Sequence, residues 1–234
     1  APPGTPEVVD RLGWLDVAGR MAARVAELTG FVDEVRADGY TDVVLLGMGG
    51  SSLAPECFWR SFGPRQGYLR LHVLDSTDPD QVRTLIEAID VDTTLVVVSS
   101  KSGGTIETKA LFEIFHARQP DGAHYVAITD PGTDLAEIAD EYGFRRTFVG
   151  DPEIGGRYSA LSVFGLVPAA LIGVDIATVL GRARAVDPAD GLFNTTNFPG
   201  ATPADLTSAR NLYSILTGRV TAINANSTLQ ADGT

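Results

Sequence analysis

The sequence of 234 residues predicts an α/β fold, in which helices cover both faces of a doubly wound sheet of five parallel strands. Short apolar runs alternate with segments of helical periodicity, which is the pattern of strand–helix–strand units. The third run, 95–98, is apolar throughout, as expected of a strand buried on both faces. A chain of this length can bury a sizeable core.

The elements follow one another in the order that such a sheet requires. Five runs are expected to form strands, at 43–46, 69–74, 95–98, 125–128 and 147–149. Helices are expected between them, near 52–61, 79–89, 105–117 and 133–142. Before the first strand, the spacing from about 7 to 37 predicts one long helix or two, with a break near Thr29-Gly30. After the fifth strand we expect an apolar helix at 158–172 and further helices near 176–185 and 203–216.

Composition divides the chain into three parts. An N-terminal helical segment (1–40) precedes the sheet domain (41–186), and an unassigned tail (187–234) follows. Asparagine is absent from residues 1–193 and occurs five times after them. We therefore expect the tail to be foreign sequence or a segment with a different history.

Charge and cysteine content narrow the class of protein. The formal net charge is −12, so bulk electrostatics favours neither nucleic acid nor an anionic membrane. The site of any anionic ligand must be built locally. A single cysteine allows no disulfide within the chain, which fits a reducing, cytoplasmic compartment. The sequence shows no signal peptide and no apolar run long enough to cross a bilayer.

The loop SSKSGGTIET (99–108) joins the third predicted strand to a helix. Such a loop aims backbone amides and the positive end of a helix dipole at one point. Lys101 adds charge there or points to solvent. Hydroxyl groups can donate hydrogen bonds to a phosphate, and glycines allow the backbone to approach it closely. The other candidates for a phosphate site are therefore Ser100, Ser102, Gly103, Gly104 and Thr105. The alternative is a polar loop in which Thr105 serves only as the N-cap.

A second glycine-rich loop, GMGGSS (47–52), follows the first predicted strand and contributes Gly49, Gly50 and Ser51. It matches neither the G-x-G-x-x-G dinucleotide pattern nor a P-loop. In a flavodoxin-like strand order the first and third strands are neighbours, and ligands bind between their carboxyl ends. Both loops are then expected to meet there.

A third motif, residues 151–162, follows the fifth predicted strand. Gly155 and Gly156 allow a tight turn that places Arg157 at the entrance of the apolar helix. An arginine there can stabilise negative charge on a reacting intermediate. The alternative is a surface arginine that pairs with Asp151 or Glu153.

At GMGGSS, SSKSGGTIET and DPEIGGRYSALSVFGLVPAALIGVD the sequence resembles phosphoglucose isomerases, which are built from two sugar-isomerase (SIS) domains. The resemblance covers about residues 10–186, the first SIS domain. Within the family, the sequence most resembles the isomerase half of bacterial transaldolase–phosphoglucose isomerase fusions. The linker-like start, Ala1 to Pro6, fits an upstream transaldolase domain in the full-length protein.

The resemblance implies a role in glycolysis and gluconeogenesis, with glucose 6-phosphate and fructose 6-phosphate as substrates. The backbone amide of Lys101 and four hydroxyl residues would hold the substrate phosphate: Ser51, Ser100, Ser102 and Thr105. Arg157 would stabilise a cis-enediolate, and the paired glycines would shape the loops. No metal or organic cofactor is implied, and neither nucleic acid nor a membrane is an expected partner.

The sequence also departs from the family pattern. The family's proton-transferring glutamate, ring-opening histidine and late lysine come from the second domain and its flanks, and none is placed here. The three histidines suit core or surface roles: His72, His116 and His124. We therefore expect an incomplete isomerase or, alternatively, a non-catalytic SIS module that senses a sugar phosphate. The resemblance is compatible with a homodimer, and a missing domain predicts an exposed apolar face and self-association.

Overall fold

The computed structural model describes residues 13–14, 16–63 and 65–185. The chain forms two compact units, residues 1–177 and 178–234, and the elements below belong to the first. Among the described elements, the helix α8 (Ile176–Ala185) includes residues of both units. The predicted helix near 203–216 and the tail that begins at residue 187 lie outside the described residues.

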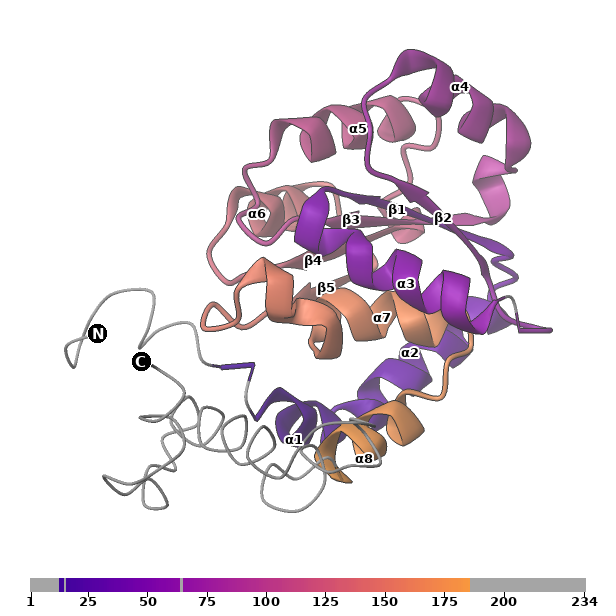
Figure 1. Cartoon of the computed structure of the whole chain (residues 1–234). Coiled ribbons are helices and arrows are strands. Elements are labelled where there is room, and N and C mark those ends of the chain that lie inside the picture. Colours follow the sequence, from indigo (N-terminus) through magenta and orange to yellow (C-terminus); the bar gives the residue numbers. More distant parts are fainter. Residues whose placement is uncertain (1–12, 15, 64, 186–234) are drawn as a thin grey trace, which may run out of the picture. The chain divides into compact units, whose positions relative to one another are not determined.

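A five-stranded parallel sheet forms the centre of the first unit, in the order β2-β1-β3-β4-β5 (Figure 1). The strands are β1 (Asp42–Gly47), β2 (Arg70–Leu74), β3 (Thr94–Ser99), β4 (Tyr125–Thr129) and β5 (Arg146–Val149). All four pairings are parallel. The predicted fold class is confirmed, and so is the expectation that the first and third strands are neighbours.

Helices cover both faces of this sheet, as Figure 1 shows. One face carries α4 (Pro79–Ala88), α5 (Ile106–His116) and α6 (Asp134–Glu141). The other carries α2 (Val25–Ala37), α3 (Leu53–Phe62) and α7 (Val163–Leu171), and the short α1 (Val17–Ala22) precedes them. Every residue of β1 and β3 is buried, because each strand has a neighbour on both sides and helices above and below.

Two predicted helix boundaries are wrong. The break in the N-terminal helical segment falls at Ala23–Arg24, between α1 and α2, and not at Thr29-Gly30. Thr29 lies inside α2, where its hydroxyl donates to the Val25 carbonyl at 2.9 Å. The helix tolerates Gly30 because it is anchored by buried residues on its inner face, namely Leu28, Phe31, Val32 and Val35.

The apolar segment predicted as one helix at 158–172 consists of two pieces. A 3₁₀ helix, η4 (Gly156–Leu161), comes first, and α7 begins only at Val163. Ser162 separates them as the N-cap of α7, and its hydroxyl accepts a hydrogen bond from the Phe164 N–H at 3.3 Å.

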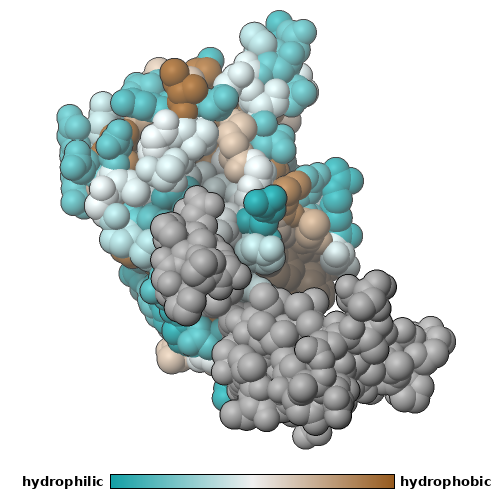
Figure 2. Space-filling view, turned by 60° about the vertical axis from the view of Figure 1, so that its left-hand side comes forward, coloured by the Kyte–Doolittle hydropathy of each residue, from teal (hydrophilic) through white to brown (hydrophobic). Residues whose placement is uncertain are grey.

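Figure 2 shows one face of the molecule, where hydrophobic residues gather in small patches among hydrophilic ones. Large apolar side chains are exposed at five described positions: Leu53, Phe62, Ile106, Val149 and Tyr158. None of the helices in the described ranges has the length and apolar character that crossing a bilayer would require.

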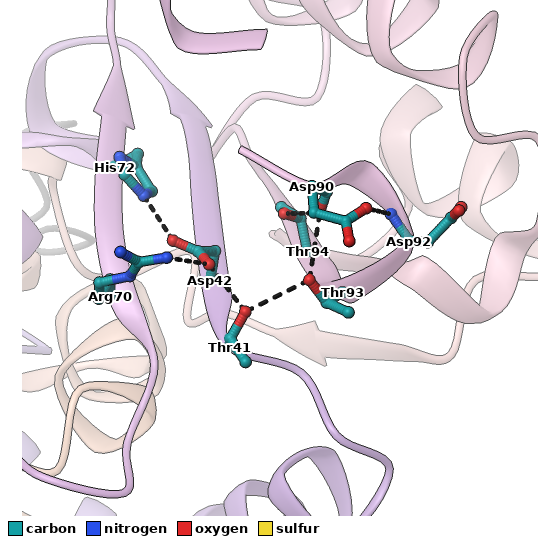
Figure 3. Close-up of polar contacts among 8 residues, drawn as sticks. All are labelled: Thr41, Asp42, Arg70, His72, Asp90, Asp92, Thr93 and Thr94. Atoms are coloured by element: carbon teal, nitrogen blue, oxygen red, sulfur yellow. Dashed lines mark hydrogen bonds and ion pairs between the residues drawn. The ribbon is translucent and has the colours of Figure 1, made fainter. Parts of the chain in front are cut away.

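A polar network joins the amino ends of β1, β2 and β3, at the opposite edge of the sheet from the loops discussed above (Figure 3). Asp42 is only 2% exposed. Its carboxylate accepts hydrogen bonds from Arg70 at 2.9 Å and Thr41 at 2.8 Å, and it lies 2.8 Å from His72 Nε2. Burial acts to raise the pKa of Asp42, but these hydrogen bonds outweigh burial, so the pKa lies below its ordinary value.

This lowered pKa predicts a pH-dependent contribution to stability. The contribution of Asp42 is fully present above its unfolded pKa of about 3.9 and is lost as the pH falls through its folded pKa. Asp42→Asn should lower the free energy of unfolding by about 1–3 kcal/mol at neutral pH, because the charge-assisted hydrogen bonds of this buried carboxylate are lost. Urea denaturation of both proteins at a series of pH values should show this difference shrinking toward pH 3.

The control for Asp42→Asn is Asp33→Asn, which removes an exposed ion pair with Arg36. That change should alter stability by less than about 1 kcal/mol at any pH. A difference between wild type and Asp42→Asn that stays constant with pH would contradict the assignment.

Candidate functional site

Three loops meet in one pocket at the carboxyl edge of the sheet. They follow β1, β3 and β5, and the first two start side by side because Gly47 pairs with Ser99. The pocket has a volume of about 370 Å³. Ten residues line it: Met48, Gly50, Ser51, Lys101, Ser102, Thr105, Asp130, Gly156, Ser159 and Phe164.

The loops after β1 and β5 approach each other backbone to backbone. A Cβ atom built on Gly50 would lie 2.6 Å from the carbonyl oxygen of Gly156, closer than any side chain tolerates. The Ser159 hydroxyl donates to the Gly156 carbonyl at 2.7 Å and lies 3.3 Å from the Gly50 carbonyl. Glycine at position 50 is therefore needed for this side of the pocket to close.

The loop after β3 is shaped by one glycine and by a pair of hydroxyls. Gly103 has a φ of +70°, and a Cβ atom there would lie 2.5 Å from the Cβ of Thr133. The hydroxyls of Ser100 and Thr105 are 3.0 Å apart. Thr105 occupies the N-cap position of α5, as the alternative interpretation expects, but its side chain caps no N–H. The first-turn N–H groups of α5 are thus left without a side-chain cap.

Several backbone amides around the pocket make no hydrogen bond to another described residue. They are those of Gly50, Lys101, Ser102, Gly104 and Thr105. The amides of Ser100 and Gly103, in contrast, donate to the carbonyls of Ile128 and Ser100. Unpaired N–H groups beside a helix N-terminus form an environment suited to an anion, since both the donors and the helix dipole favour negative charge.

The two cations considered in the sequence lie in different surroundings. Lys101 neither points to solvent nor ends free in the pocket, because its ammonium pairs with Asp130. Arg157 is exposed, and its side chain forms no ion pair or hydrogen bond with another described residue. The alternative pairing of Arg157 with Asp151 is not formed, since the Asp151 carboxylate pairs with Arg20.

The structure brings six of the predicted site residues into the pocket lining: Gly50, Ser51, Lys101, Ser102, Thr105 and Gly156. The other six lie outside the lining: Gly49, Ser100, Gly103, Gly104, Gly155 and Arg157. Ser100 is buried with its hydroxyl against that of Thr105, and the backbone of Gly103 lies close to Thr133.

Sequence reasoning missed four lining residues: Met48, Asp130, Ser159 and Phe164. Asp130 was predictable, because it directly follows the carboxyl end of β4 and ligands bind at the carboxyl ends of parallel strands. Ser159 lies inside the third motif, two residues after Arg157. None of the three histidines lines this pocket. His72 contacts Asp42, His116 packs on Tyr142, and His124 lies near the Thr94 carbonyl.

Comparison with known protein families gives a match to the phosphoglucose isomerase family over residues 13–224. The matched range extends into the tail that the sequence analysis set apart. A curated glucose-6-phosphate isomerase of Cyanothece sp. is 36% identical over 202 residues, which are 83% of this chain and 37% of that protein. The enzyme of Thermosynechococcus vestitus is 40% identical over 169 residues, 69% of this chain and 32% of that protein. The chain thus spans about a third of the length of these relatives.

Two solved structures superpose well on this chain. A crystal structure of a hypothetical protein from Thermus thermophilus superposes with a TM-score of 0.66 and 31% identity, covering 92% of this chain and 49% of that one. A glucose-6-phosphate isomerase from Chlamydia trachomatis superposes with a TM-score of 0.65 and 27% identity, covering 84% of this chain and 37% of that one. With a family match over most of its length, the chain belongs to the phosphoglucose isomerase family.

Proposed function

We propose that this chain binds the phosphate group of a hexose 6-phosphate in the pocket formed by the loops after β1, β3 and β5. The observation that carries the proposal is the convergence of these loops around unpaired backbone N–H groups at the start of α5. A phosphate dianion accepts hydrogen bonds from such donors even in a protein of net charge −12, because the donors are local. The hydroxyls of Ser51, Ser102 and Thr105 would add further donors.

The proposed reaction is the interconversion of glucose 6-phosphate and fructose 6-phosphate. It requires ring opening, transfer of a proton between C1 and C2 through a cis-enediolate, and reprotonation. Arg157 is exposed and unpaired among the described residues, so its guanidinium is available to stabilise the enediolate charge. The family membership and the names of the curated relatives, about a third of whose length the chain spans, support this reaction.

A second candidate is binding without turnover. The single carboxylate that lines the pocket among the described residues is that of Asp130, and it is paired with Lys101. The described part of the chain therefore presents no free general base at the pocket, and such a base is typically worth about 10²–10⁴ in rate. This observation favours a chain that, by itself, binds a sugar phosphate and isomerises it slowly or not at all.

The wider setting proposed for the full-length protein is cytoplasmic hexose phosphate metabolism. The names of the curated relatives support the hexose phosphate metabolism, and the cytoplasmic location rests on the low cysteine content. A homodimer and an upstream transaldolase domain belong to the same proposal, and their support is the sequence resemblance.

A thermal-shift titration tests the binding step. Fructose 6-phosphate should raise the unfolding midpoint, and at 100 times its dissociation constant it should add about 2.7 kcal/mol to the free energy of unfolding. Fructose should have no effect, because it lacks the phosphate. The double variant Ser100→Ala/Thr105→Ala should lose the rise, while Thr29→Ala/Ser61→Ala, which changes the same residue types on exposed helix positions, should keep it.

An equal response of the wild type to fructose and fructose 6-phosphate would contradict the proposed phosphate site. A coupled assay of fructose 6-phosphate conversion then separates the two candidates. Turnover well above background assigns isomerase activity to this chain, and binding with background turnover assigns the second candidate.

A further inference from the structure

The side chain of Lys101 lines the pocket, but its ammonium group is paired with other groups of the protein. Its ammonium forms an ion pair with Asp130 at 2.5 Å and donates a hydrogen bond to the Asp151 carbonyl at 2.9 Å. Both side chains of the pair are largely buried, with 18% of the lysine and 15% of the aspartate exposed. The charge of Lys101 is thus compensated inside the protein.

These contacts join three loops at the carboxyl edge of the sheet. Lys101 belongs to the loop after β3, Asp130 directly follows β4, and Asp151 lies in the loop after β5. The Asp130 N–H also donates to the Lys101 carbonyl at 3.2 Å, so the first two loops are linked twice. Ser102 and Thr105 line the pocket from the loop after β3, and Gly156 and Ser159 line it from the loop after β5. A link between these two loops therefore constrains the distance across the pocket.

The Asp130 side chain is closely surrounded by Gly150 and Phe164. A Cβ atom at Gly150 would lie 2.6 Å from Asp130 Oδ1 and 2.7 Å from Cε2 of Phe164. Asp130 Oδ1 is buried and has no hydrogen-bond partner among the described residues. A buried ion pair that leaves an acceptor unpaired is a poor source of stability, which favours a geometric role for it over a stabilising one.

The charges of the pair allow two opposite expectations for a phosphate ligand. If the Lys101 ammonium binds the phosphate directly, Asp130 competes with the phosphate for the ammonium. Removal of the Asp130 carboxylate should then strengthen phosphate binding. If Lys101 acts as a link between loops, Asp130 holds the link in place, and its removal should weaken binding even though the pocket becomes more positive.

We propose that Asp130 is a positioning residue that holds the Lys101 ammonium between the loops after β3 and β5 and so keeps the pocket at the width a phosphate group needs. The inference rests on the proposed sugar-phosphate binding. In this arrangement the phosphate is held by neutral N–H and O–H donors and by the dipole of α5, and Lys101 contributes its backbone amide but not its side-chain charge.

Calorimetric titration of the full chain with fructose 6-phosphate, and with inorganic phosphate as a second probe, tests this role. Asp130→Asn and Lys101→Met should each weaken binding of both probes, by about tenfold, and the double variant should bind no more weakly than the poorer single variant, because the two residues act as one unit. Lys101→Arg should recover part of the loss. The matched control is Asp38→Asn, which removes the ion pair with Arg145 away from the pocket and should leave both affinities unchanged.

Tighter or unchanged phosphate binding by Asp130→Asn would overturn the inference, and so would additive losses in the double variant. If Asp130→Asn does not fold, the comparison of Lys101→Met with Lys101→Arg decides, since equal losses in these two would also overturn it. The inference and the proposed function fail differently. A wild type that binds neither probe contradicts the function, whereas a wild type that binds and variants that bind equally well contradict only the role of Asp130.

Discussion

Replacing Gly50 by alanine should abolish sugar-phosphate binding. The added Cβ would lie 2.6 Å from the Gly156 carbonyl oxygen and 2.7 Å from its carbonyl carbon, so the obstacle is backbone and cannot rotate away. The loops after β1 and β5 must then separate, which misplaces the Gly50 amide and Ser159 at the pocket. Overpacking of this kind costs about 1–3 kcal/mol. Thermal shift should show a lower midpoint and no response to fructose 6-phosphate.

The matched control is Gly30→Ala, the same chemical change on an exposed position of α2, where a Cβ atom meets nothing within 4 Å. This variant should gain about 0.5–1 kcal/mol of stability, since alanine is the better helix former, and should bind fructose 6-phosphate as the wild type does. Wild-type affinity in Gly50→Ala would show that the close approach of the two loops is not needed for binding.

Phe112→Ala should cause the largest loss of stability, about 3–5 kcal/mol. Phe112, on α5, is 1% exposed and lies at the centre of an aromatic cluster. The centroid of its ring lies 5.4–5.5 Å from the ring centroids of Tyr125, Tyr142 and Phe144. Because α5 presents its N-terminus to the pocket, a cavity beneath it should also loosen the phosphate loop. Urea denaturation and calorimetric titration measure the two effects.

Phe62→Ala is the control for this change, since Phe62 is 60% exposed on α3. It should lower the free energy of unfolding by no more than about 0.5 kcal/mol. Similar losses in Phe112→Ala and Phe62→Ala would contradict the packing described for the core.

The centre of the sheet was predictable from the sequence because β1, β3 and β4 are buried at every residue and so appear as continuous apolar runs. β3 shows this most clearly, and its predicted bounds differ from the observed ones by one residue at each end. The helix boundaries were less predictable. Gly30 suggests a break by its low helix propensity, yet the buried side of α2 carries the helix through it. Ser162 ends one helical segment and caps the next, and its single hydroxyl is a weak signal in an apolar stretch.

The candidate site was predictable where it depends on local patterns and not where it depends on tertiary contacts. Glycines and hydroxyls at strand ends identify the loops after β1 and β3. The pairing of Lys101 with Asp130 joins residues 29 positions apart, and no local pattern indicates it. Ser100 and Thr105 look equivalent in the sequence, but the fold buries Ser100 while Thr105 lines the pocket.

The phosphate pocket is tested most directly by amide chemical shifts during a titration of the ¹⁵N-labelled chain with fructose 6-phosphate. The largest changes should fall on the unpaired amides of Gly50, Lys101, Ser102, Gly104 and Thr105, with fructose causing none of them. Shifts confined to the amino edge of the sheet, around Asp42, or equal shifts with fructose, would contradict a phosphate site at the carboxyl ends of β1 and β3.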